Sequence, residues 1–222
     1  RRFLITALLA FVYVVLALAS AVLNPVEPAA VGLLPRGAIW ISLLIPILSW
    51  SILLRLFHIF PSQALQYSLR GKPVLINLLI GAGVGLAAVL HLYMVSYFIP
   101  SMEYPAGQFS REGLIWGACV LAGLIVPAEE LLFRGAAFSI LYDELNVHFP
   151  GAVARVTVLN VLVHLVIIVS SHSIQPFALL TLVYRAGLSA ACLYLVLRRR
   201  SLLPCMLANL IFSMATGWLF AL

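Results

Sequence analysis

Long apolar runs alternate with short polar connectors along the whole chain of 222 residues. Each run is close to the roughly 20 residues that a helix needs to cross the hydrocarbon core of a bilayer. The connectors contain proline, glycine and asparagine, which are typical of turns. About seven spans are predicted in this way: 3–23, 38–59, 74–99, 113–142, 152–171, 177–197 and 202–222. The pattern predicts an all-α, polytopic transmembrane helix bundle that forms one integral membrane domain over residues 1–222.

Composition excludes a water-soluble fold, because 64% of the residues are hydrophobic and only 9% are charged. Soluble domains carry about 25% charged residues. The basic residues behind the net charge of +6 are dispersed or lie at helix ends, so they do not predict nucleic-acid binding. Most of them fall on one side if the N-terminus is inside: Arg1, Arg2, Arg70, Lys72, Arg198, Arg199 and Arg200. This bias predicts an N-terminus inside and a C-terminus outside.

Small residues in the apolar runs indicate close packing rather than chemistry. Cys119, Cys192 and Cys205 form no CxxC pair and are interpreted as small buried hydrophobic residues. The alternating glycines at positions 81, 83 and 85 lack the polar loop of a nucleotide-binding turn. They predict a place where two helices approach closely.

Two adjacent glutamates and an arginine interrupt the fourth predicted span, within residues 127–135. A charged side chain at the centre of a spanning helix costs about 2.5–3.5 kcal/mol on insertion scales, so such residues indicate a functional site. Glu130 and Arg134 are four residues apart and share a helix face, which predicts an ion pair. Glu129 is turned by about 100° and needs another partner. Glu129 is therefore the candidate general base, and Pro127 is predicted to open the helix just before it.

His164, in the middle of the fifth span, is the best second group, with Asn160 one turn earlier on the same face. A carboxylate and a neutral imidazole can together hold and polarise one water molecule. In the last span Asn209 and Ser213 also share a face and could donate to an oxyanion, or could simply join helices. Arg185 lies within a span too and needs a partner, for which Glu129 is one option.

Metal binding is not predicted. Two glutamates and one histidine would be enough ligands for zinc. However, the chain has no HExxH motif and no cysteine cluster, and adjacent glutamates point to different sides of a helix. Neither a metal nor another cofactor is therefore expected.

Residues 129–135 resemble the first signature of the CAAX-protease and bacteriocin-processing family, glutamate-dependent intramembrane proteases of the type II CAAX prenyl endopeptidase kind. The family's second signature has an aromatic residue four before a histidine, where this chain has Asn160 and His164. Its third signature is His-x-x-x-Asn, where this chain has Asn209 and Ser213. The resemblance covers residues 113–217, which form the predicted protease-like core.

The resemblance implies that Glu129 activates a water with His164, that Glu130, Arg134 and Asn160 hold the site together, and that Asn209 and Ser213 stand at the oxyanion positions. It implies an endopeptidase of a prokaryotic cytoplasmic membrane that cuts a membrane-associated protein or peptide near its C-terminal or membrane-embedded end. Peptide maturation, bacteriocin immunity and cleavage of sorting tails are the roles it suggests. Two alternatives stay open: an inactive binding or regulatory scaffold of the same family, because Asn209 replaces a histidine, and a small proton-coupled transporter.

Overall fold

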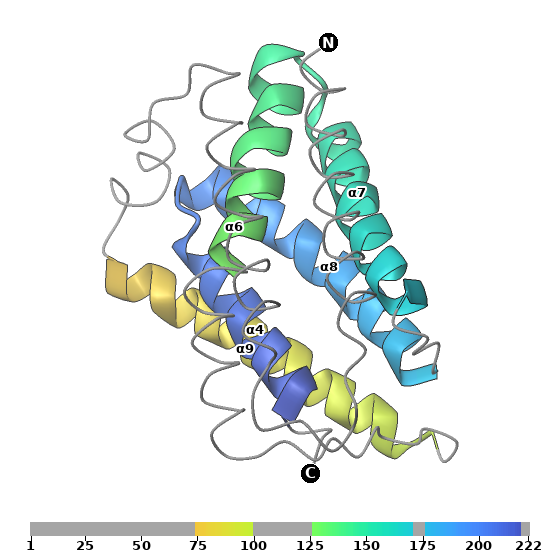
Figure 1. The fold of residues 1–222 in the computed structure, drawn as a ribbon. Helices are drawn as coiled ribbons and strands as arrows, with labels where there is room; N and C mark the ends of the chain where they lie inside the picture. The colour runs from red at the N-terminus through yellow and green to blue at the C-terminus, as the bar shows by residue number, and fades with distance from the viewer. Residues whose placement is uncertain (1–73, 100–125, 171–175, 219–222) are drawn as a thin grey trace, which may run out of the picture.

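The computed structural model describes residues 74–99, 126–170 and 176–218, and every regular element within these ranges is a helix (Figure 1). The long helices are α4 (Val74–Tyr97), α7 (Phe149–Ser170), α8 (Pro176–Arg199) and α9 (Leu203–Trp218). The short α6 (Val126–Glu130) and the π-helices η3 (Leu131–Ala137) and η4 (Ile140–Glu144) precede α7. The predicted all-α class is thus confirmed for the described residues. The spans predicted at 3–23 and 38–59 lie outside them, so the count of seven stays a prediction.

The four long helices coincide with the spans predicted at 74–99, 152–171, 177–197 and 202–222, with starts that differ by at most about three residues. Within the described ranges α4 and α8 are long and apolar enough to cross a membrane. Both helices also expose large apolar side chains, among them Leu79, Leu90 and Val183. Such exposure fits helices that face lipid, and the fold therefore fits a membrane protein.

The predicted span at 113–142 differs from the structure in its helix type. Its described part begins at Val126 as an α-helix and changes to π-helix after Glu130. The backbone N–H of Phe138 accordingly donates to the carbonyl of Phe133, five residues back. π-helical turns are rare and are often found at functional sites. Here the turn follows directly after the two glutamates, whereas the sequence had predicted an opening of the helix just before them, at Pro127.

A tight corner between α8 and α9 is encoded by local sequence. Arg200 takes a positive φ of 52°, which ends α8 with a left-handed residue. The hydroxyl of Ser201 then accepts the backbone N–H of Leu203 at 3.3 Å and caps the start of α9. Pro204 stands in the first turn of α9, where its missing N–H is not needed. The corner brings α9 back against α8 and α4, which it contacts.

Helices α4 and α9 lie side by side, and two glycines allow their close approach (Figure 1). A Cβ atom at Gly81 would lie 2.4 Å from the carbonyl oxygen of Pro204, and one at Gly85 would lie 2.9 Å from that of Ala208. Gly83 faces open space. The predicted close packing through small residues is therefore confirmed at two of the three alternating glycines.

The described helices bury two apolar clusters. One joins η3 and η4 to α7 and contains Phe133, Leu141 and Val156. The other joins α4, α8 and α9 and contains Leu92 and Phe212. Five of the buried polar side chains come from α6, η3, α7 and α9: Glu130, Arg134, Asn160, His164 and Asn209. Because polar side chains are costly inside an apolar protein, these five residues mark the candidate functional site.

Candidate functional site

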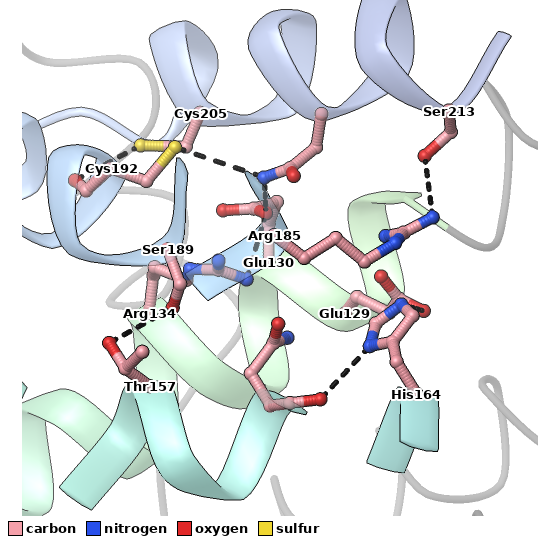
Figure 2. A network of polar contacts seen from close by, with 12 residues as sticks. Glu129, Glu130, Arg134, Thr157, His164, Arg185, Ser189, Cys192, Cys205 and Ser213 are labelled. Atoms are coloured by element: carbon pink, nitrogen blue, oxygen red, sulfur yellow. Dashed lines mark hydrogen bonds and ion pairs between the residues drawn. The ribbon is translucent and has the colours of Figure 1, made fainter. Parts of the chain in front are cut away.

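Glu129 at the end of α6 and His164 in α7 face each other, although 35 positions separate them in the sequence (Figure 2). The Oε1 atom of Glu129 lies 3.7 Å from Nε2 of His164. Both side chains are largely buried, with exposed fractions of 11% and 10%. A separation of 3.7 Å is longer than an ordinary direct hydrogen bond, which spans about 2.7–3.2 Å. The pair is therefore close enough to act on the same atom without being locked to each other.

The orientation of His164 comes from its own helix. Its Nδ1 atom lies 2.9 Å from the backbone carbonyl oxygen of Asn160, one turn earlier. A carbonyl oxygen can only accept, so Nδ1 carries a proton, and in the neutral ring Nε2 would present its lone pair toward Glu129. Asn160 thus supports the site through its backbone. Earlier in α7, the hydroxyl of Thr157 donates a hydrogen bond to the hydroxyl of Ser189 at 3.4 Å, and this bond joins α7 to α8 (Figure 2).

Glu130 is the centre of a second, fully buried network (Figure 2). Its Oε1 atom lies 3.0 Å from Nη1 of Arg134, so the predicted ion pair is present. The same oxygen accepts a hydrogen bond of 2.5 Å from the side-chain amide of Asn209, which belongs to α9. That amide also approaches the sulfur of Cys192 in α8 at 3.8 Å. The network joins α6, η3, α8 and α9, and it fixes the backbone of the residue next to Glu129.

Arg185 in the middle of α8 contacts α9. Its Nη2 atom donates to the hydroxyl of Ser213 at 3.4 Å, and its guanidinium lies 5.8 Å from the centre of the Phe212 ring. Figure 2 shows this guanidinium on the side of the network where Glu129 and His164 lie. The predicted need of Arg185 for a partner is met here by a hydroxyl and an aromatic ring.

The structure therefore divides the predicted site residues into three groups. Glu129 and His164 form one pair, with the carbonyl of Asn160 behind it. Asn209 belongs with Glu130 and Arg134, and it does not contact the pair within the described residues. Ser213 belongs with Arg185, for which the sequence had offered Glu129 as one possible partner. The signal for Arg185 was its charge within an apolar run, but nothing in the spacing of Asn209 and Ser213 paired it with Ser213.

The remaining histidines and cysteines do not join the pair in the described residues. His91 in α4 bonds to the hydroxyl of Tyr184 in α8, and His148 is exposed. Cys192 and Cys205 are buried free thiols, as expected of small apolar residues. Within the described ranges no three side chains among His, Cys, Asp and Glu gather at one point. His58, Cys119 and His172 lie outside these ranges.

The fold and the site define a helical membrane protein that holds a carboxylate and an imidazole together among its helices. Residues 111–215 match the family described as type II CAAX prenyl endopeptidase, Rce1-like. This match confirms the resemblance, and these residues are similar to that family, which is a family of proteases. The matched residues almost coincide with the predicted core at 113–217 and include every site residue described above. No curated protein and no solved structure matches the chain.

Proposed function

We propose that this protein is an intramembrane endopeptidase that uses a water activated by Glu129 and His164. The observation that carries the proposal is the 3.7 Å contact between Glu129 Oε1 and His164 Nε2. The substrate would be a membrane-associated protein or peptide, cut near its C-terminal or membrane-embedded end. Similarity to a family of CAAX prenyl endopeptidases supports this substrate class.

The hydrogen-bonding state of the pair suits a water nucleophile. The Glu129 carboxylate accepts hydrogen bonds, and so does Nε2 of a neutral His164 whose Nδ1 proton is bonded to the carbonyl of Asn160. Two acceptors cannot form a hydrogen bond with each other, but one water molecule can donate a hydrogen bond to each of them. A water held in this way directs its oxygen lone pairs away from the pair and toward a bound carbonyl carbon. Its position would satisfy both acceptors, which apolar surroundings require.

The reaction then needs no covalent intermediate. The water oxygen attacks the scissile carbonyl carbon while its proton passes to Glu129, and the carbonyl π electrons move to the oxygen. When the tetrahedral intermediate collapses, the C–N bond breaks and Glu129 returns that proton to the departing amine. One water is consumed, and one carboxyl and one amine are formed. His164 orients the water and lowers the cost of charge in the transition state.

Glu130, Arg134 and Asn209 would support this chemistry without touching the substrate. Their network fixes the junction between α6 and η3, and so the direction in which Glu129 leaves the helix. This assigns Asn209 a supporting role in place of the oxyanion donor that the resemblance implied. Catalytic groups have to be held to within a fraction of an ångström, and a buried network of this kind can do so.

Glu129→Gln is the direct test, measured with the full chain in lipid nanodiscs. The probes are a prenylated peptide that ends in a CAAX sequence and an unprenylated peptide with a short C-terminal apolar helix and a basic tail. We expect the wild type to cut at least one probe and Glu129→Gln to cut neither, while both proteins accumulate equally. Asp143→Asn, which changes an exposed carboxylate of η4, is the matched control and should cut normally.

Two further outcomes separate this proposal from other schemes. Cleavage that survives chelators supports a water activated by a carboxylate, whereas loss of cleavage on chelation would indicate a metal-dependent reaction. The scaffold alternative is favoured by one observation, the engagement of Asn209 with Glu130. If Glu129→Gln keeps the phenotype of the wild type in cells, the protein acts as a binding or regulatory scaffold.

A further inference from the structure

We propose that Arg185 stabilises the oxyanion of the reaction and that Ser213 holds its guanidinium in place. This inference rests on the proposed hydrolysis, because it assigns the group that receives the charge that Glu129 and His164 generate. It replaces the expectation that Asn209 and Ser213 are themselves the donors.

The first observation is the place of Arg185 among the helices. Arg185 stands near the middle of the 24-residue helix α8, an apolar helix whose other basic residues, Arg198 and Arg199, lie in its last turn. An arginine at that depth is costly and normally faces the interior of a bundle or a polar site. Figure 2 shows its guanidinium on the same side as Glu129 and His164. The cation is thus close to the point where a carbonyl would be attacked.

The second observation is how the guanidinium is held. Its Nη2 atom donates to the hydroxyl of Ser213 at 3.4 Å, and the ring of Phe212 lies 5.8 Å from the guanidinium carbon. Both partners belong to α9, so α8 and α9 together set the direction of the side chain. An arginine presents its N–H donors in a rigid planar fork, and the bond to Ser213 helps to set the orientation of that fork. A fixed planar cation of this kind suits a charge that develops on a carbonyl oxygen.

The third observation concerns the alternative donor. The amide of Asn209 donates to Glu130 and approaches the sulfur of Cys192. To reach an oxyanion beside Glu129, Asn209 would have to break the bond to a buried carboxylate. The guanidinium of Arg185 already lies on the side of the network where Glu129 and His164 lie (Figure 2). Arg185 is therefore a better candidate than Asn209 for donating hydrogen bonds to the oxyanion.

The test compares rate and binding in variants of the full chain in nanodiscs. The probes are the peptide that the wild type cuts and the aldehyde of the same sequence, whose hydrate resembles the tetrahedral intermediate. Loss of one oxyanion donor typically lowers kcat by about 10²–10³-fold. We expect Arg185→Gln to lower kcat by that factor, to leave KM nearly unchanged, and to weaken inhibition by the aldehyde by a similar factor. Arg185→Lys and Ser213→Ala should have the same kind of effect, but smaller.

Arg198→Gln is the matched control, because Arg198 also donates to a hydroxyl and lies over an aromatic ring, both belonging to Tyr194, but at the exposed end of α8. This variant should keep the wild-type kcat. The proposal is overturned if Arg185→Gln keeps kcat, or if kcat falls while inhibition by the aldehyde is unchanged. If Arg185→Gln does not accumulate, Arg185→Lys and Ser213→Ala decide by the same two readouts.

Failure of this inference is distinct from failure of the proposed function. If Glu129→Gln abolishes cleavage and Arg185→Gln does not, the hydrolysis stands and only the role of Arg185 falls. If Glu129→Gln cuts like the wild type, or the wild type cuts no probe, both proposals fall together.

Discussion

A methyl group added at Gly81 is expected to push α9 away from α4. The new Cβ would lie 2.4 Å from the carbonyl oxygen of Pro204 and 2.8 Å from its Cα. Both are backbone atoms, so no side chain can rotate away to relieve the overlap. Overpacking of this kind costs about 1–3 kcal/mol. Gly83→Ala makes the same chemical change two residues later, where nothing lies within 4 Å, and is the matched control.

The expected loss can be measured as a shift in melting temperature. For a domain of this size 1 kcal/mol corresponds to about 2–4 °C, so Gly81→Ala should lower the melting temperature by about 2–12 °C. Cys192 and Cys205 are buried free thiols, and a maleimide dye that reacts with them on unfolding gives the readout in detergent or nanodiscs. Gly83→Ala should melt at the wild-type temperature or slightly above it.

The same substitution should reach the candidate site. Pro204 lies in the first turn of α9, and Asn209 follows less than two turns later. A displaced α9 would weaken the bond between Asn209 and Glu130, so cleavage by the folded fraction of Gly81→Ala should fall as well. An unchanged melting temperature for Gly81→Ala, or an equal loss for Gly83→Ala, would show that α4 and α9 do not pack as described.

Other variants probe the two polar groups separately. Glu130→Ala and Arg134→Ala should each lower accumulation in the membrane, because each leaves an unpaired buried charge at a cost of about 3–5 kcal/mol; quantitative immunoblotting measures this. The double variant should accumulate better than either single one, and a strictly additive loss would argue against the pair. Asn160→Ala should keep the kcat of the wild type per folded molecule, because His164 bonds to the backbone carbonyl, which alanine retains. A kcat reduced by an order of magnitude or more would instead assign a role to the Asn160 amide.

The identities of the site residues could be predicted from the sequence, whereas many of the contacts that these residues make could not. The acid pair stood out because charges are costly in an apolar run, and the i, i+4 rule gave the bond between Glu130 and Arg134. His164 stood out as an ionisable group in the middle of an apolar span, and the structure places it beside Glu129. Helix existence was also predictable from the length of the apolar runs, as α4, α7, α8 and α9 show.

The missed features depend on tertiary packing. The π-helical turn after Glu130 has no marker in composition, because its residues form α-helices equally well. Asn209 and Ser213 share a face of α9, which predicted a common role, yet their side chains meet different partners on α6 and α8. Periodicity places two residues on one face of a helix, but it does not say which neighbouring helix each of them meets.

The two departures from the family's third signature fit one arrangement. An asparagine at position 209 can donate to Glu130 without adding a charge, so the carboxylate keeps Arg134 as its counter-ion. A serine at position 213 is short and offers an acceptor, which is what the guanidinium of Arg185 needs beside it. The substitutions at 209 and 213 are therefore better understood together with Arg185 than as losses of function one at a time.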